Sequence, residues 1–334
     1  MRPTVAIVYN DPIPARYEAI GEEKAIFGVL DEVAAVAEAL VELGYPYVRL
    51  PLTPPIQQTK ARLKGHPADL FFNLFEGFDG RPETEARMAG ILAKLGLAFT
   101  GCPEVALALA LDKARLKERL KASGIATPEY QVLSPENVSF FHLNFPCIVK
   151  PASEDASHGL TENSVVNDPA SLKDQVSRVS QFYGGTALVE EFLTGREFNT
   201  IIIGNREPEA LAVSEITYSL PAYLPRILTF AAKWETSSLY YQATRPVCPA
   251  QIEDRLRREI METAERAYRL VGCRGYARVD MRLDARDRVH VLEVNPNPDI
   301  SPTAGAALQI KAAGLTFSQF VEKIIGFALE QDQS

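Results

Sequence analysis

A predicted hairpin at residues 275–295 constrains the fold of this chain more than any other feature of the sequence. Its first strand carries apolar residues at odd positions and charged residues at the even positions 278, 280 and 282, as a strand with one buried face does. On the return strand, Leu292 and Val294 are expected on one face, and Glu293 and Asn295 on the other. One face of the hairpin therefore packs on a core, while the other gathers polar groups.

The polar face of this hairpin suits a cation. If the turn at 285–288 sets the register, Asp280 lies opposite Glu293 and Arg278 lies opposite Asn295. Carboxylates that face each other destabilise a sheet unless a cation lies between them. Mg²⁺ typically takes one or two carboxylates together with water and nucleotide phosphates. We therefore predict a metal–phosphate site here, against the alternative of a surface hairpin held by salt bridges.

The composition is that of an ordinary globular protein. With 334 residues, 46% of them hydrophobic and 23% charged, the chain is long enough for two or three domains. The net charge of −8 and the lack of a basic stripe argue against a nucleic-acid partner. Local lysines and Mg²⁺ can nevertheless neutralise the phosphates of ATP in an acidic protein.

The spacing of the cysteines and the length of the apolar runs predict the cellular compartment of the protein. Four cysteines are scattered without metal-ligand spacing, which predicts reduced thiols in a cytoplasmic protein. The apolar run at 5–9 is too short for a signal peptide. No apolar run approaches the roughly 20 residues that a membrane span needs, so we expect no membrane partner.

The first hundred residues alternate between predicted strands and helices, which indicates an α/β domain with a doubly wound parallel sheet. Asp31 is expected to cap the first helix, and the acidic segment 10–26 is expected to be a mobile loop. Ligands gather beyond the carboxyl ends of strands in such sheets, where Glu76 follows a strand. The predicted strands are 5–9, 47–50 and 69–74, and the predicted helices are 31–43 and 83–95.

The rest of the chain indicates a small strand-rich region and then a larger one that contains the hairpin. We predict domains at 1–102, 103–189 and 190–334. Two segments, 152–159 and 218–249, are expected to be loops that close over a site. The other predicted elements are a helical stretch at 103–124, strands at 129–133, 146–151 and 187–192, and helices at 252–271 and 317–330.

Two strand ends carry residues that suit a nucleotide. Lys150 ends an apolar strand directly before a loop whose Ser157, His158 and Gly159 amides could hold phosphates. Glu190 ends another strand, where backbone groups could bind an adenine edge and a carboxylate could bind ribose hydroxyls. Taken singly, Lys150 could equally be a snorkelling surface lysine and Glu190 a surface charge. Lys113 and Glu197 have the same plain alternative, a solvated charge.

Together these motifs resemble the ATP-grasp fold, and more narrowly its D-alanine–D-alanine ligase branch. The resemblance runs from about residue 69 to the C-terminus, and the order and spacing of the motifs are more specific than any single one. The resemblance implies ATP clamped between a small central domain and a C-terminal antiparallel-sheet domain. Its strongest parts are residues 99–101, which read Phe-Thr-Gly, 109–113, which read Leu-Ala-Leu-Asp-Lys, 149–151, 189–197, 275–280 and 292–296.

The resemblance also implies roles for individual residues. Arg278 would stabilise a tetrahedral intermediate, assisted by Ser157 and Lys233. Two Mg²⁺ ions, which Mn²⁺ can replace, would share Glu293. The implied metal ligands are Asp280, Glu293 and Asn295. The residues implied in ATP binding are Lys113, Lys150, Ser157, His158, Gly159, Glu190, Glu191, Phe192, Leu193, Glu197 and Lys233.

The chain departs from the family's pattern where the amino acids would bind. Glu76 stands where the family has a histidine, Trp234 where it has a tyrosine, and Ala156 where it has a loop serine. Ala304 and Gly305 stand where a serine–leucine pair meets a substrate carboxylate, and the family's glycine- and serine-rich motif with its glutamate is missing. We therefore expect altered amino-acid specificity. The candidate substrate residues are Glu76, Trp234, Asp299 and Ser301.

The sequence thus predicts an ATP-dependent ligase that joins a carboxylate to an amine through an acyl phosphate and releases ADP and phosphate. A D-alanine–D-alanine ligase of cell-wall synthesis and a non-catalytic nucleotide-binding regulatory protein remain as alternatives. The expected partners are small amino-acid or carboxylate substrates, and the resembled branch often forms homodimers.

Overall fold

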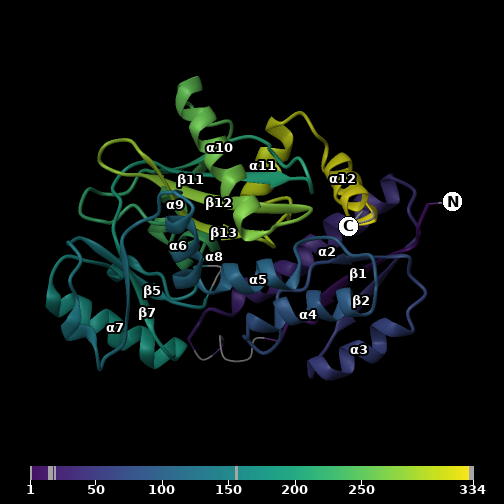
Figure 1. Ribbon diagram of the computed structural model, residues 1–334, viewed down its shortest axis with the longest axis horizontal. Coiled ribbons are helices and arrows are strands. Elements are labelled where there is room, and N and C mark those ends of the chain that lie inside the picture. The colour runs from purple at the N-terminus through teal and green to yellow at the C-terminus, as the bar shows by residue number, and fades with distance from the viewer. Residues whose placement is uncertain (1, 14–17, 19, 155–156, 331–334) are drawn as a thin grey trace.

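The computed structural model describes residues 2–13, 18, 20–154 and 157–330, and its strands form three sheets (Figure 1). The first sheet is parallel, in the order β2-β1-β3. Every residue of β1 is buried, which is why this strand reads as an unbroken apolar run. The predicted parallel α/β domain is therefore confirmed. Its strands are β1 Val5–Asn10, β2 Tyr47–Leu52 and β3 Leu70–Asn73.

The helices of this domain are α2 Gly28–Glu42, α3 Ile56–Lys64 and α4 Glu83–Lys94. The predicted cap at Asp31 is wrong, because α2 begins three residues earlier and Asp31 lies inside its first turn. A carboxylate is favoured there by the partial positive charge of the helix N-terminus. The short 3-10 helix η1 Glu23–Phe27 leads directly into α2.

The central sheet is antiparallel, in the order β4-β7-β5-β6. The helix α7 Pro169–Tyr183, capped by Asp168, packs against this sheet and was not predicted. The boundary proposed between residues 189 and 190 falls inside β7, and the domain limits remain a proposal. The strands are β4 Tyr130–Leu133, β5 Cys147–Pro151, β6 Val165–Val166 and β7 Ala187–Glu191.

Two helices connect the first two sheets. The predicted helical stretch divides into α5 Glu104–Leu111 and α6 Lys113–Ala122, with a break at Asp112. The Asp112 carboxylate accepts the backbone N–H of Arg115 at 3.1 Å, so it caps α6. This cap fixes the start of the helix that presents Lys113. Two further 3-10 helices are η2 Val138–Phe140 and η3 Glu162–Ser164.

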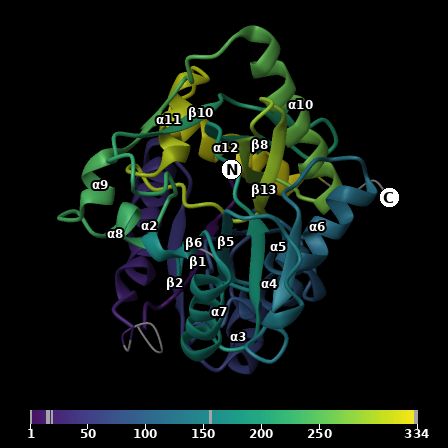
Figure 2. The ribbon, with the colours of Figure 1, turned by 90° about the vertical axis from the view of Figure 1, so that its left-hand side faces the viewer.

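The C-terminal sheet has the order β11-β10-β8-β12-β13, with β9 paired to β8, and lies above the central sheet in Figure 2. The predicted loop at 218–249 also contains α8 Phe230–Trp234, α9 Leu239–Ala243 and β11 Thr244–Val247. The other strands are β8 Glu197–Ile203, β9 Glu209–Ala210, β10 Ser214–Tyr218, β12 Tyr276–Leu283 and β13 Val289–Asn295. The remaining helices are α10 Asp254–Val271, α11 Gly305–Ala312 and α12 Phe317–Leu329.

The predicted hairpin is formed by β12 and β13, and its register is as expected at the polar end. Asp280 pairs with Glu293, and Arg278 pairs with Asn295. A β-bulge follows, because Met281 pairs with residue 291 and leaves Leu292 unpaired in the register. The prediction that Leu292 faces the core is therefore wrong: its side chain lines a cavity instead.

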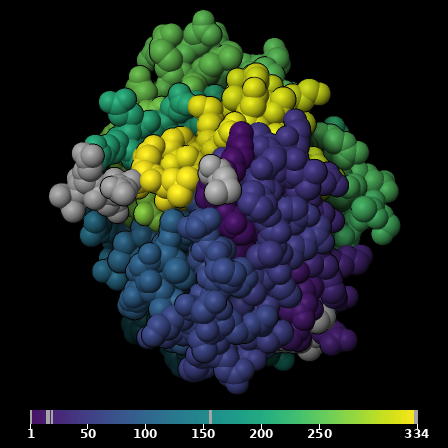
Figure 3. All heavy atoms as spheres, turned by 90° about the vertical axis from the view of Figure 1, so that its right-hand side faces the viewer, coloured from purple at the N-terminus to yellow at the C-terminus, as the bar shows by residue number. Residues whose placement is uncertain are grey.

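One hydrophobic core joins the first and last domains. Phe71 and Met88 from the N-terminal part pack in the same cluster as Ile260 and Val279 from the C-terminal part. Figure 3 shows the C-terminal segment, in yellow, lying directly against N-terminal residues in purple. Among the described residues, no helix combines the length and the apolar character that crossing a membrane requires.

Candidate active site

Two adjoining cavities lie between the sheets. The smaller cavity, of about 110 Å³, is lined by residues of the central and C-terminal sheets and of neighbouring segments. The larger cavity, of about 650 Å³, extends to the loops of the N-terminal domain. Lys113, Glu197, Lys233, Asp280 and Glu293 line both, so the two cavities form one continuous site.

The structure brings most of the residues singled out from the sequence to this site. Gly159 and Ser301 line neither cavity. The predicted residues that line the larger cavity include Glu76, Trp234, Arg278, Asn295 and Asp299. Those that line the smaller cavity are Lys113, Lys150, Ser157, His158, Glu190, Glu191, Phe192, Leu193, Glu197, Lys233, Asp280 and Glu293.

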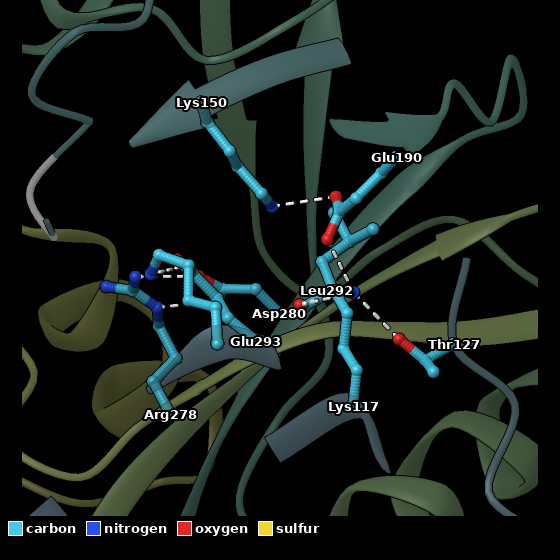
Figure 4. A network of polar contacts seen from close by, with 9 residues as sticks. Lys117, Thr127, Lys150, Glu190, Arg278, Asp280, Leu292 and Glu293 are labelled. Carbon is cyan, nitrogen blue, oxygen red and sulfur yellow. Dashed lines mark hydrogen bonds and ion pairs between the residues drawn. The ribbon is translucent and has the colours of Figure 1, made fainter. Parts of the chain in front are cut away.

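Lysines and acids form a buried network beside the smaller cavity (Figure 4). Lys150 Nζ lies 2.8 Å from one carboxylate oxygen of Glu190, and Lys117 Nζ lies 2.6 Å from the other. Burial raises the pKa of Glu190, but the charges of the two lysines outweigh it and leave that pKa below its ordinary value. Because the Glu190 side chain is 1% exposed, the alternative of a surface charge is wrong.

Lys117 belongs to this network and was missed in the sequence. Its buried ammonium also donates to Thr127 Oγ1 at 2.8 Å and to the carbonyl of Leu292, the bulged residue, at 3.4 Å. Burial lowers the pKa of Lys117 to about 8. Lys117 follows Lys113 by one turn on α6, so helical periodicity was the signal that could have found it.

The polar face of the hairpin holds its charges in pairs. Arg278 donates two hydrogen bonds to Asp280, at 2.7 and 2.8 Å, and Lys113 Nζ lies 3.1 Å from Glu293. The Lys113 ammonium, acting against burial, holds the pKa of Glu293 far below its usual range. Asn295 Oδ1 accepts the N–H of residue 297 at 3.0 Å.

This face fits a hard divalent cation. The part of the chain that the structure describes contains no group of three or more His, Cys, Asp or Glu residues able to hold a metal. The donor set therefore rests on Asp280 and Glu293 together with the amide oxygen of Asn295. Both carboxylates already attract cationic side chains, and an all-oxygen set of this kind suits Mg²⁺ better than soft metals.

Glu197 is also held from two sides. Its Oε2 accepts the hydroxyl of Tyr218 at 2.8 Å and lies 3.2 Å from a guanidinium nitrogen of Arg282. Burial raises the pKa of Glu197 despite the opposing charge of Arg282. The Arg282 guanidinium in turn lies 4.8 Å from the centre of the Phe192 ring, which lines the smaller cavity.

A second unpredicted contact closes the site from the N-terminal side. The buried carboxylate of Glu22 lies 2.7 Å from Nδ1 of His158 and accepts the N–H of Gly159 at 3.1 Å and the hydroxyl of Tyr183 at 2.9 Å. We name these three contacts the Glu22 clasp. The predicted mobility of segment 10–26 is not supported at Glu22, and residues 14–17 and 19 lie outside the described residues.

The loop end held by the clasp has little freedom. Gly159 has φ +78°, and a Cβ there would lie 2.8 Å from Cγ of Pro151, so a larger residue is strained and crowded. The ring of His158 lies 5.4 Å from that of Phe230, which lies 6.4 Å from Trp234. These contacts bring the 152–159 loop and α8 together. Residue 156, where the family's serine is replaced, lies outside the described residues.

The larger cavity is bounded by loops that follow β3 and β13. The backbone N–H of Glu76 donates to Asn10 Oδ1 at 2.9 Å, which ties the two N-terminal strand ends together. The N–H of Ser301 donates to Asp299 Oδ1 at 2.7 Å, and Ser301 itself is buried. Glu32 of α2 lines the same cavity and was missed, because it reads as one more acid on a helix.

Comparisons with known proteins agree with this geometry. The family model "D-ala D-ala ligase C-terminus" matches residues 120–326. The D-alanine–D-alanine ligase of Haemophilus influenzae is 31% identical over 302 residues, which cover 88% of this chain and 94% of that protein. The chain belongs to the D-Ala–D-Ala ligase family. The uncharacterized protein y4sG of Sinorhizobium fredii is 33% identical over 261 residues, covering 78% of this chain and 74% of that protein.

Solved structures agree in fold. The VanG D-Ala:D-Ser ligase of Enterococcus faecalis superposes with a TM-score of 0.75 at 20% identity, covering 98% of this chain and 100% of that one. The D-alanine–D-alanine ligase of Bacillus anthracis complexed with ATP superposes with a TM-score of 0.72 at 19% identity, covering 98% of this chain and 97% of that one. The predicted ATP-grasp fold is thus confirmed. Family membership also confirms the predicted enzyme class, an ATP-dependent ligase that forms a C–N bond.

Proposed function

We propose that this ligase activates a carboxylic acid with ATP and Mg²⁺ and then joins it to an amine. A carboxylate repels the γ-phosphate of ATP, so cationic groups must offset the charge of both. Lys113, Lys150 and Lys233 line the smaller cavity and would contact the phosphates. A carboxylate oxygen then bonds to the γ-phosphorus and ADP leaves. The amine nitrogen attacks the acyl carbon, phosphate leaves, and the amine loses a proton.

The residues around the phosphates would divide the work. Asp280, Glu293 and Asn295 would hold Mg²⁺, as two ions that share Glu293, and the bound metal (or Mn²⁺ in its place) would neutralise phosphate charge. Arg278 would face the oxyanion that forms when the amine attacks. For this, Arg278 exchanges part of its bidentate contact with Asp280 for the substrate oxygen.

The smaller cavity would hold the nucleotide. Glu191, the last residue of β7, would contact adenine together with Phe192 and Leu193 directly after it, with Glu190 behind them and Glu197 near the ribose. Ser157, His158 and Gly159 would cover the phosphates, because the Glu22 clasp holds this loop end over the site. Excluding water there protects the acyl phosphate from hydrolysis.

The larger cavity supports a substrate pair other than two D-alanines. Glu76 suits a substrate amine, and Trp234 adds an apolar wall. Ala304 and Gly305 bring no side-chain donor to the start of α11, where an acceptor carboxylate would need one. We therefore propose an amino-bearing carboxylic acid as donor and an acceptor other than free D-alanine. Ser301 and Asp299 border this region.

One observation carries the proposal: three lysines and the oxygen-rich face of the hairpin converge on a single cavity. The test is a panel of amino acids and small carboxylic acids offered in pairs to the purified protein with ATP and Mg²⁺. We expect one pair to release ADP and phosphate and to give an amide by mass spectrometry. Release of AMP and pyrophosphate with that pair would reject the acyl-phosphate route.

D-Alanine alone is expected to support little or no ADP release at millimolar concentration. The relatives named D-alanine–D-alanine ligase, at about a third identity over most of the chain, favour the opposite outcome. Turnover in the ordinary enzyme range of roughly 1–10³ s⁻¹, with D-Ala-D-Ala as product, would show that the substitutions at Glu76 and Ala304 leave the family's specificity intact. A cytoplasmic location and a homodimer remain predictions.

A further inference from the structure

Arg282 is a buried arginine on the polar face of the hairpin. It lies on β12 two residues after Asp280, so both side chains are on the same face of the strand. The Arg282 side chain is 5% exposed and lines the smaller cavity. Burying a charge to this degree is costly unless the group is paired and hydrogen-bonded. The partners of its guanidinium therefore indicate what this arginine holds in place.

The Arg282 guanidinium connects three segments around the smaller cavity. Nε donates to the carbonyl of Gly195 at 3.1 Å, Nη1 to Oε2 of Glu197 at 3.2 Å, and Nη2 to the carbonyl of Arg226 at 2.6 Å. The guanidinium also lies 4.8 Å from the centre of the Phe192 ring. One side chain thus fixes the start of β8 and two neighbouring segments that border the cavity.

Glu197 uses one carboxylate oxygen within the protein and has the other available for a ligand. Its Oε2 accepts both the hydroxyl of Tyr218, at 2.8 Å, and Nη1 of Arg282. Within the described part of the chain, Oε1 accepts no hydrogen bond, and the residue lines both cavities. Tyr218 keeps its proton, because burial and the charge of Glu197 raise its pKa well above the ordinary value. Two donors on Oε2 therefore fix the orientation of the carboxylate.

These contacts define the group that Oε1 of Glu197 can bind. An ionised carboxylate only accepts hydrogen bonds, so the ligand must donate them. Arg282 already compensates the charge of Glu197, which favours a neutral donor such as a hydroxyl over a second cation. A vicinal diol presents two hydroxyl donors side by side. Phe192 and Leu292 supply apolar surface in the same cavity, as the base attached to a ribose needs.

We propose that Arg282 is a positioning residue, which directs Oε1 of Glu197 to the ribose hydroxyls and so makes the site select ribonucleotides over deoxyribonucleotides. This inference rests on the nucleotide site of the proposed function. It adds Arg282 and Tyr218 to that site as residues that act through Glu197. The selected ligand is a nucleoside triphosphate that carries both ribose hydroxyls.

The test measures the binding of ATP, 2′-deoxy-ATP and 3′-deoxy-ATP by calorimetry, with Mg²⁺ and without any other substrate. The wild-type protein should bind ATP about tenfold more tightly than each deoxynucleotide, as for one hydrogen bond to a charged group. Arg282→Lys keeps the charge but cannot reach three separate acceptors. It should therefore bind ATP as weakly as the deoxynucleotides, whose own affinities should change little. Tyr218→Phe, which keeps the ion pair, should lower the preference for ATP several-fold.

Arg196→Lys is the matched control. Arg196 makes a similar fork, to Glu215 at 2.7 and 2.6 Å, but lines neither cavity. This variant should leave all three affinities unchanged. Unfolding midpoints of all variants, measured in parallel, show which of them are folded.

Three results would overturn the assignment of Arg282. One is equal affinity of the wild-type protein for the three nucleotides, and another is a folded Arg282→Lys variant that loses the same factor for all three. If Arg282→Lys does not fold, Tyr218→Phe decides, and an unchanged preference for ATP in that variant is the third. A selective loss of ATP affinity in Arg282→Lys, without ADP release from any substrate pair, would support the positioning role and count against the proposed ligase reaction.

Discussion

At the scale of single residues, the site works by balanced charge. Glu293 stays ionised because Lys113 lies 3.1 Å away, and Glu190 stays ionised because two lysines flank it. Lys113 and Lys117, one turn apart on α6, thus each pair with an acid from a different sheet. The two acids differ in exposure. Glu293 lines both cavities, whereas Glu190 is almost fully buried.

Replacing Glu293 by glutamine should remove Mg²⁺-dependent turnover while the fold is kept. The loss of one shared ligand charge should lower kcat by roughly 10²-fold or more, the scale of a lost electrostatic stabiliser. Steady-state kinetics at several Mg²⁺ concentrations measures it, with Glu209→Gln, an exposed change on β9, as the control. Near-normal activity in the folded Glu293→Gln variant would reject the metal assignment.

Replacing Lys117 by methionine should destabilise the protein by about 3 kcal/mol, because Glu190 loses one of two buried partners. The double variant Lys117→Met with Glu190→Gln should recover more than half of this loss, since the uncompensated charge is then gone. Chemical denaturation of the single and double variants measures both values. An equal loss in the two proteins would mean that Lys117 stabilises through packing and not through the ion pair.

At the scale of elements, the Glu22 clasp holds the end of the 152–159 loop against the N-terminal domain. Glu22 reaches His158, Gly159 and Tyr183, so one carboxylate fixes both the loop and the end of α7. The ring contact from His158 to Phe230 extends this closure to α8. A loop fixed at this point is suited to keeping water from the phosphates.

Glu22→Gln should loosen that loop and let water reach the acyl phosphate. The ratio of ADP to amide product should rise several-fold above one, with a smaller change in the KM for ATP. Coupled ADP assays and product quantification on the same samples measure the ratio. Glu18→Gln, an exposed change in the same segment, should keep the ratio near one. A Glu22→Gln enzyme with tight coupling would show that the clasp does not control water.

Local patterns explain why some elements could be predicted. Apolar and polar residues alternate along β12 and β13, as they do in any hairpin with one buried face. The pairing of Asp280 with Glu293 could therefore be predicted from the sequence. The bulge at Leu292 could not be predicted, because one extra residue leaves the pattern of the flanking strand unchanged. The helix α7 was not predicted. It lies between the predicted strands 146–151 and 187–192, and the region around it was interpreted as rich in strands.

At the scale of the whole molecule, three sheets meet around one continuous site. The nucleotide side could be predicted, because its residues lie in short motifs with family spacing. Glu22 and Glu32 could not, since each acts across a domain boundary on partners more than a hundred residues away. How the domains pack decides which acidic side chain points into a cavity. The pattern of residues within a single helix or strand carries no information about that packing.

The central claim is that a carboxylate oxygen attacks the γ-phosphate of ATP. The most direct measurement uses a donor acid labelled with ¹⁸O in its carboxylate, incubated with ATP, Mg²⁺ and the acceptor. One ¹⁸O atom should appear in each molecule of released phosphate, and ADP should be the nucleotide product, as detected by mass spectrometry. Unlabelled phosphate beside a labelled amide, or label in AMP, would contradict the account.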